Sequence, residues 1–198
     1  MEQQYLTMCC IVCWIIFLEL TPSLLSTFAS RKLCHAGCGV GIMLLDSTHP
    51  HSRLFVWAVA ASSIAMTWNL SPLPPFRFSR PKDIGITVYL LLVSVWFALQ
   101  MSSSILAPLF FADPAGAVVG KACSKAFGPR RNPTWSGEKT LAGTAAVFAF
   151  TYATIAFRCT TTARLAIAAI AAVAEGVGGD FDNLAIAAVV LLGWWVCT

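Results

Sequence analysis

Acidic side chains in apolar surroundings are the residues of this sequence whose types and spacing could do chemistry. Asp113 lies in a long apolar run, where a carboxylate is costly unless it is paired or bound to a metal. Glu175, Asp180, Asp182 and Asn183 fall within nine consecutive positions. Asp182 or Asn183 could cap a final helix, but three carboxylates and a carboxamide exceed what a cap needs. Hard oxygen donors of this kind suit Mg²⁺, so we expect a divalent metal site.

Lys139 marks a segment suited to an anion. It follows Gly137 and precedes Thr140, which can cap a helix that we expect to begin at Leu141. A glycine, a lysine and a helix start together make an anion site, as in phosphate-binding loops. The segment lacks the GxxxxGK[ST] pattern, so it is not a Walker loop. We expect it to bind phosphate groups.

The segment RKLCH stands at the start of the second apolar run. Arg31 and Lys32 could mark the cytoplasmic end of a membrane helix, or they could bind a polyphosphate. His35 shares a helix face with Arg31, and an ionisable group at membrane depth usually has a function. Cys34, His35 and Cys38 give only a weak zinc signal, because no partner pair of ligands lies nearby.

Helices that cross a membrane must position these residues. Of the 198 residues, 58% are hydrophobic and 11% are charged, whereas a soluble domain carries roughly a quarter charged residues. We therefore predict an all-α fold, a polytopic transmembrane helix bundle of about 7–8 membrane helices, in which residues 1–198 form one catalytic domain. The expected spans are Tyr5–Phe28, Cys34–Leu45, Leu54–Leu70, Ile84–Met101, Ile105–Gly120, Leu141–Phe157, Leu165–Val177 and Leu184–Cys197.

Basic residues fall unevenly when these spans alternate between the two sides of the membrane. Ten of the thirteen lysines and arginines come to one face, which the positive-inside rule assigns to the cytoplasm or to the equivalent compartment of an organelle. Most of the acidic residues fall on or near the same face. The net charge of +4 therefore reflects membrane topology, and we expect no nucleic-acid partner.

Four segments, in order, resemble the family of dolichol, phytol and farnesol kinases, which are polytopic membrane enzymes related to phosphatidate cytidylyltransferases. These segments are RKLCH, ADPAGAVVGK, GEKTLAGT and AEGVGGDFDNLAI, and their order and spacing agree with the family between Arg31 and Leu184. Two departures are Lys121, where the family commonly has arginine, and Thr140, where it commonly has serine.

The resemblance implies a CTP-dependent kinase that transfers phosphate to a membrane lipid alcohol, an isoprenoid alcohol such as phytol or farnesol rather than dolichol. It implies Mg²⁺ or Mn²⁺ held by Asp113, Glu175 and Asp182. The residues implied to bind the nucleotide are Arg31, Lys32, Lys121, Gly137, Lys139, Thr140 and Asn183. Catalysis would use His35, Asp113 and Lys139, with His35 accepting the proton of the alcohol.

Other functions fit the same residues. A CTP-dependent diacylglycerol kinase would differ only in its acceptor, and a phosphatidate cytidylyltransferase would transfer a nucleotidyl group. A small membrane transporter or scaffold could use buried acids as an ion path, but a transporter should show an inverted repeat, and none is visible. The partners expected are a nucleoside triphosphate, a lipid alcohol and the lipid bilayer, in the endoplasmic reticulum or a plastid membrane with the active face cytoplasmic or stromal.

Overall fold

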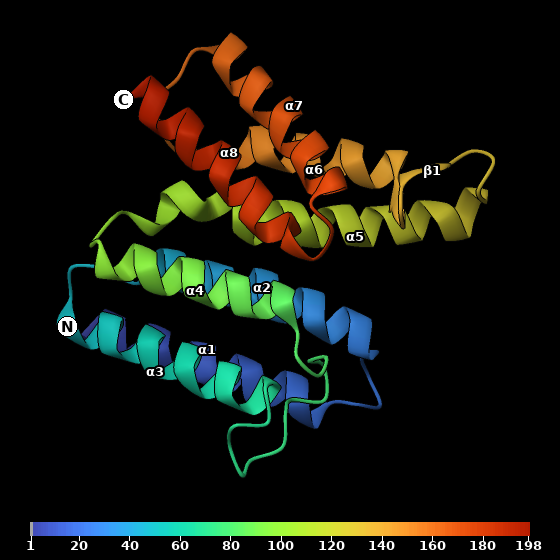
Figure 1. The fold of residues 1–198 in the computed structure, drawn as a ribbon. Coiled ribbons are helices and arrows are strands. Elements are labelled where there is room, and N and C mark those ends of the chain that lie inside the picture. Colours follow the sequence, from blue (N-terminus) through green and yellow to red (C-terminus); the bar gives the residue numbers. More distant parts are fainter. Residues whose placement is uncertain (1) are drawn as a thin grey trace. The chain divides into compact units, whose positions relative to one another are not determined.

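The computed structural model describes residues 2–198, which form eight α-helices and one short two-stranded hairpin (Figure 1). The predominantly helical class is thus confirmed. The chain divides into two compact units, the first ending at Ser103 and the second comprising Ser104–Thr198. That all 198 residues form one catalytic domain stays a prediction.

The first unit contains four helices. These are α1 (Glu2–Leu20), α2 (Thr27–Leu44), α3 (Pro50–Thr67) and α4 (Ile84–Ala98). Within the unit, α1 contacts α2 and α3, and α3 contacts α4. The expected span Tyr5–Phe28 is wrong at its end, because α1 stops at Leu20 ahead of Pro22 and Ser26 caps a new helix.

Arg77 holds the end of α1 inside the first unit. Its guanidinium donates to the carbonyl oxygens of Leu18, Glu19 and Leu25 and to Ser30 Oγ. Its backbone N–H donates to the Glu19 carboxylate. The last carbonyls of a helix have no partner within the helix, so one guanidinium satisfies those of Leu18 and Glu19 at once.

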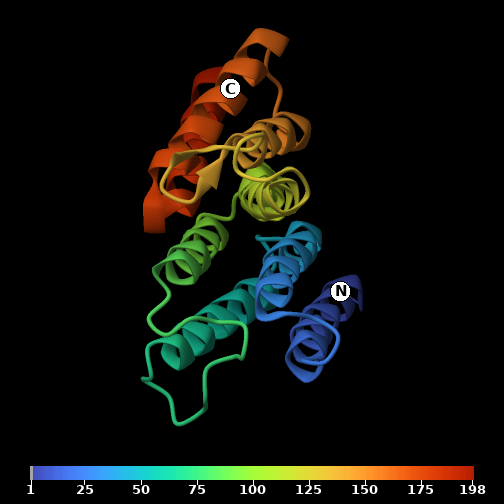
Figure 2. The same cartoon turned by 90° about the vertical axis from the view of Figure 1, so that its right-hand side faces the viewer.

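The second unit contains the other four helices and the hairpin. Its elements are α5 (Ala107–Phe127), β1 (Thr134–Ser136), β2 (Lys139–Thr140), α6 (Leu141–Thr154), α7 (Thr161–Val177) and α8 (Asp182–Cys197), with 3₁₀ turns at Ser103–Leu106 and Gly179–Phe181. Helix α5 lies along α6 and also contacts α8, while α7 contacts both α6 and α8 (Figure 2). The four helices α5, α6, α7 and α8 therefore pack together within the second unit.

Small residues let α5 and α6 approach closely. A Cβ added to Gly143 would lie 2.9 Å from the Gly116 carbonyl oxygen, and one added to Gly120 would lie 2.9 Å from Thr140 Oγ1. Backbones this close leave no room for larger side chains, as in small-residue seams between membrane helices. The glycines after Asp113 thus have a packing role.

The hairpin is the one regular element that the predicted all-α fold lacked. Strands β1 and β2 pair with Ser136 opposite Lys139, which leaves Gly137 and Glu138 as a two-residue turn. Gly137 has a φ of 52°, a left-handed value that glycine adopts without the steric cost of a side chain. The turn places Lys139 directly ahead of α6.

Within residues 2–198, three helical segments are long and apolar enough to cross a membrane: Glu2–Leu20, Ser103–Phe127 and Gly179–Cys197. The last two are α5 and α8 together with the 3₁₀ turns that precede them. The apolar helices Ile84–Ala98 and Leu141–Thr154 are shorter, with 15 and 14 residues. At about 1.5 Å per residue they span little more than 20 Å of a hydrocarbon core about 30 Å thick.

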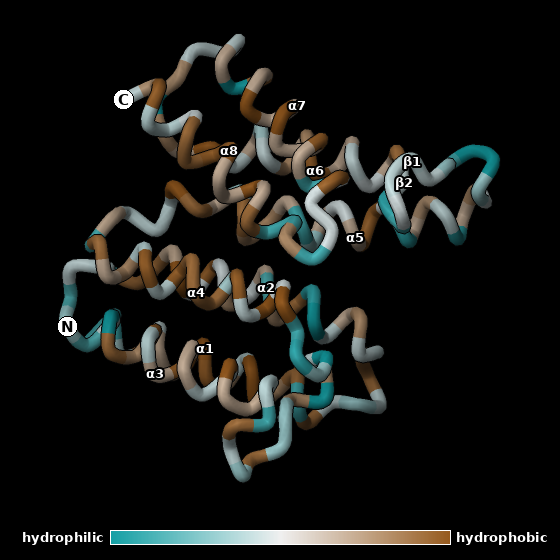
Figure 3. Tube along the Cα trace, in the orientation of Figure 1, coloured by the Kyte–Doolittle hydropathy of each residue, from teal (hydrophilic) through white to brown (hydrophobic). Residues whose placement is uncertain are grey.

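Hydrophilic residues gather at the connection between α5 and β1 (Figure 3).

Candidate functional site

Three carboxylates that are distant in sequence meet within the second unit. Asp113 comes from α5, Glu175 from the last turn of α7, and Asp182 is the first residue of α8. One carboxylate oxygen from each lies within 4.8 Å of the others. We call these three residues the acidic cluster.

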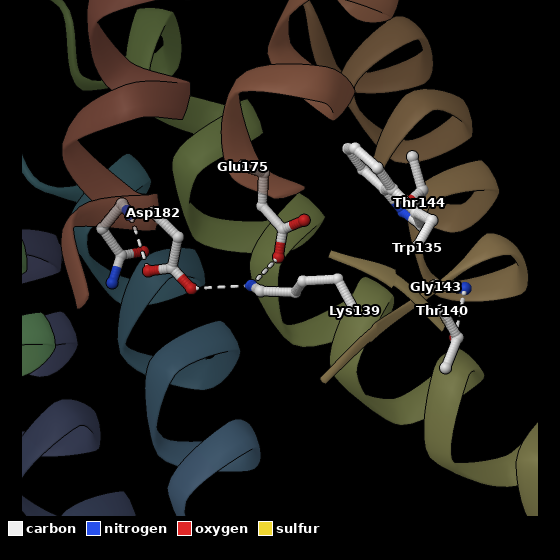
Figure 4. Close-up of polar contacts among 8 residues, drawn as sticks. Trp135, Lys139, Thr140, Gly143, Thr144, Glu175 and Asp182 are labelled. Atoms are coloured by element: carbon white, nitrogen blue, oxygen red, sulfur yellow. Dashed lines mark hydrogen bonds and ion pairs between the residues drawn. The ribbon is translucent and has the colours of Figure 1, made fainter. Parts of the chain in front are cut away.

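Lys139 reaches into the acidic cluster from the hairpin. Its ammonium donates to Asp182 Oδ2 at 2.9 Å and also to Glu175 Oε1 (Figure 4). The other Asp182 oxygen, Oδ1, accepts the backbone N–H of Asn183 at 2.8 Å. The suggested N-cap position of Asp182 or Asn183 is wrong, because Phe181 occupies the N-cap of α8 and both residues lie in its first turn.

Burial differs between the acids and the lysine. Asp113 is 5% exposed and Glu175 is 4% exposed, whereas the side chain of Lys139 is 27% exposed. Burial lowers the pKa of Lys139, but the nearby carboxylates of Asp182 and Glu175 outweigh it and raise the pKa above the usual 10.5. Lys139 is therefore a stable cation at neutral pH.

Local capping interactions hold the hairpin and the start of α6. Thr140 Oγ1 accepts the N–H of Gly143, which confirms the predicted helix cap. Asn132 is buried, donates to the Gly120 carbonyl and to Ser124 Oγ, and accepts the N–H of Ala142. One carboxamide thus ties the end of α5 to the beginning of α6.

Trp135 fixes the hairpin to two helices. Its indole N–H donates to Thr144 Oγ1 on α6 at 2.7 Å (Figure 4). Its ring lies against Gly176 so closely that an added Cβ there would meet the ring at 2.1 Å. Gly176 directly follows Glu175, so this contact positions both Lys139 and its carboxylate partner.

Sequence reasoning assigned no role to Asn132 or Trp135. A tryptophan and an asparagine inside a polar loop were the available signal, since an indole N–H and a carboxamide both favour specific hydrogen-bond partners; in the structure Asn132 is buried and Trp135 is exposed. Their partners lie on other elements, so the sequence alone could not identify them.

The donor set fits a divalent metal. Carboxylate oxygens are the ligands that Mg²⁺ and Mn²⁺ prefer. In an octahedral Mg²⁺ site adjacent ligands stand about 3.0 Å apart and opposite ligands about 4.2 Å apart, whereas the oxygens of the acidic cluster lie within 4.8 Å of one another. Side-chain rotations that bring these oxygens closer would let Asp113, Glu175 and Asp182 hold one ion together.

The predicted site residues near the N-terminus belong to the first unit. Arg31 pairs with Asp83 at 2.8 Å, and Asp83 also caps α4. The His35 ring packs on Tyr89, with ring centroids 4.3 Å apart. Lys32 is half-buried. We had expected Arg31 and Lys32 at the start of a helix, but α2 begins at Thr27, so they lie one turn inside it.

Cys34 and Cys38, the two cysteines near His35, lie close to each other. The sulfur atoms of Cys34 and Cys38 lie 3.9 Å apart on one face of α2, and both thiols are free. The zinc site considered for these residues stays untested.

The remaining predicted nucleotide ligands lie in the second unit. Lys121 is exposed on α5, which continues to Phe127 and so extends beyond the expected span Ile105–Gly120. Gly137 is exposed in the hairpin turn, and Asn183 is buried next to Asp182. The nucleotide roles of these residues stay predictions.

Comparison with known proteins found no relative: no family model, no curated protein and no solved structure matches this chain.

Proposed function

We propose that the protein is a membrane phosphotransferase that transfers a phosphate from CTP to a membrane lipid alcohol, an isoprenoid alcohol such as phytol or farnesol. One observation carries the proposal: Asp113, Lys139 and the Glu175–Asp182 pair come from three separate segments and meet in one cluster. Those are three of the four segments on which the resemblance to lipid-alcohol kinases rests.

The acidic cluster suits the metal that such a transfer requires. Mg²⁺ or Mn²⁺ would neutralise charge on the phosphates and hold them in line with the acceptor. Asp113 and Glu175 are buried, and buried carboxylates on three helices hold their ligand oxygens in a fixed arrangement.

Lys139 and the start of α6 suit the phosphate groups. The ammonium is a point charge that can bind a phosphate oxygen. Thr140 caps α6, and the positive end of the helix dipole at this point favours an anion. The first N–H groups of α6 already donate to Pro133, Asn132 and Thr140, so the charge of Lys139 would provide the main attraction. Phosphoryl transfer depends mainly on such positioning and charge stabilisation.

A lipid acceptor accords with the apolar helices. Three helices are long enough to cross a bilayer, and further short apolar helices are compatible with the bundle of about 7–8 spans that we propose. The bias of basic residues supports an active face in the cytoplasm, or in the stroma if the membrane is that of a plastid.

The test is an assay with purified protein in detergent, CTP and a panel of phytol, farnesol, dolichol and diacylglycerol. The proposal expects label from γ-³²P-CTP in the product of an isoprenoid alcohol and no lipid label from α-³²P-CTP. Lipid labelled from α-³²P-CTP would instead identify a cytidylyltransferase. Label in diacylglycerol alone would identify a diacylglycerol kinase, and no label with any acceptor would reject phosphate transfer from CTP.

A further inference from the structure

We propose that Lys139 is a mobile counter-ion of the acidic cluster, whose ammonium leaves Glu175 and Asp182 when these carboxylates bind a divalent cation. The inference rests on the proposed function, because it takes the acidic cluster to be the metal site. It adds a competition between an internal cation and the metal for the same oxygen atoms.

The hydrogen bonds of Asp182 define the competition. Oδ1 accepts the backbone N–H of Asn183, and Oδ2 accepts the ammonium of Lys139. A metal that binds Asp182 through Oδ2 meets the ammonium there, and the same holds at Glu175 Oε1. Two cations beside one oxygen repel each other, so metal binding drives Lys139 away.

Burial and chain position decide which partner moves. Asp113, Glu175 and Asp182 are anchored on three helices, and the first two are buried. Lys139 lies on a two-residue strand that follows the exposed turn at Gly137, and its long flexible side chain is partly exposed. The lysine can therefore swing out while the carboxylates stay in place.

Formal charge supports an exchange of cations. The ammonium of Lys139 brings one positive charge to these carboxylates, and a divalent cation in its place would bring two. Lys139 precedes Thr140, the cap of α6, so the displaced ammonium stays close to the proposed phosphate site. The lysine would thus stabilise the cluster first and bind phosphate afterwards.

The first experiment measures Mn²⁺ binding by electron paramagnetic resonance, with full-length protein in detergent and no nucleotide. Lys139→Met removes the competing charge and keeps a long apolar stem, so we expect its Kd for Mn²⁺ to be at least tenfold lower than that of the wild type. Lys125→Met is the matched control, because Lys125 is exposed in the last turn of α5, and its Kd should equal the wild-type value.

The second experiment needs no variant, which matters if Lys139→Met fails to fold. Wild-type protein is acetylated with limiting acetic anhydride, with and without Mg²⁺, and each lysine is quantified by mass spectrometry. We expect Mg²⁺ to raise acetylation of Lys139 several-fold and to leave Lys125 unchanged.

The outcomes separate the inference from the proposed function. If the wild type binds Mn²⁺ but Lys139→Met binds it no more tightly, or if Mg²⁺ does not raise acetylation of Lys139, the counter-ion role is wrong and the metal site stands. If neither protein binds Mn²⁺, both the counter-ion role and the metal-dependent function are wrong.

Discussion

The substitution Asp113→Asn separates a metal ligand from a structural acid. The amide has nearly the size and shape of the carboxylate, so packing around this buried position on α5 is preserved. The change removes one negative charge and weakens one metal ligand. We expect the change to lower turnover and to leave thermal stability without metal unchanged or higher.

The structure gives the magnitude of the electrostatic change. Two carboxylates 4.8 Å apart repel each other by about 3 kcal/mol if the effective dielectric constant is about 20. Asp113→Asn relieves this repulsion toward Glu175 and Asp182, and a neutral amide is cheaper to bury than a carboxylate. Without divalent metal, the variant should therefore be at least as thermally stable as the wild type.

Turnover should respond in the opposite direction. A metal ligand supports several kcal/mol of transition-state stabilisation, and at about 1.4 kcal/mol per tenfold even 3 kcal/mol amounts to more than a hundredfold in rate. We expect Asp113→Asn to lose at least a hundredfold in kcat with CTP and the accepted alcohol. We also expect Mg²⁺ to raise the melting temperature of the wild type and not that of the variant.

The assay pairs thermal unfolding in detergent, with EDTA or with Mg²⁺, with the initial rate at saturating Mg²⁺. Asp180→Asn is the matched control, because Asp180 is exposed in the turn between α7 and α8 and is not part of the acidic cluster. That variant should keep its rate and its response to Mg²⁺. A well-folded Asp113→Asn protein with a near wild-type rate would exclude Asp113 from the mechanism.

Three further predictions concern packing, pH and topology. Gly143→Val should lower the melting temperature in detergent, because its Cβ would lie 2.9 Å from the Gly116 backbone oxygen and overpacking costs about 1–3 kcal/mol. The pKa of Lys139 is raised above 10.5 by its carboxylate partners against the effect of burial, so its stabilising effect is complete below pH 10.5 and is lost as the pH rises through the raised value. The melting temperatures of wild type and Lys139→Met, followed across this pH range in EDTA, should therefore converge only at the alkaline end. In a cysteine-free background, single cysteines at Lys125 and Asp180 should be labelled from the same side of the membrane, and labelling from opposite sides would exclude one active face.

Composition predicts the helical class well, and helix ends poorly. Apolar runs specify that a segment is buried or membrane-embedded, but they do not specify where its backbone hydrogen bonds end. The run Tyr5–Phe28 reads as one span, yet α1 stops at Leu20, and Arg77 from a distant loop satisfies its last carbonyls. That loop lies more than 50 residues away along the sequence, so no local pattern predicts it.

The hairpin was missed for a related reason. Five residues in two strands are too few for the alternation of polar and apolar side chains that marks a strand. Gly137 in a two-residue turn was the one local signal, and it fits a phosphate-binding loop equally well. The contacts of Trp135 with α6 and α7 help to fix where the turn lies, and no local pattern predicts them.

The acidic cluster could be predicted because buried charge is expensive. Asp113 in an apolar run and two acids in a short segment stand out whatever the fold, and a cluster of carboxylates needs a compensating cation. What the sequence could not give is the partner of each acid. The lysine was expected to face a phosphate, whereas in the structure its ammonium lies between Glu175 and Asp182.

The position of the Lys139 ammonium between Glu175 and Asp182 helps to decide whether the acidic cluster is a metal site or a structural ion cluster. A purely structural ion cluster is most stable when its charges balance, because every uncompensated buried charge adds to the cost of folding. Glu175 and Asp182 share the one ammonium of Lys139, and Asp113 and Glu175 are almost completely buried. A cation site needs carboxylates in excess of the fixed positive charges around them, and here the carboxylates are held on three separate helices. A cation that the metal replaces must be able to move, and Lys139 on its short strand has a flexible side chain. The arrangement therefore favours a metal site over a salt bridge that only joins α7, α8 and the hairpin.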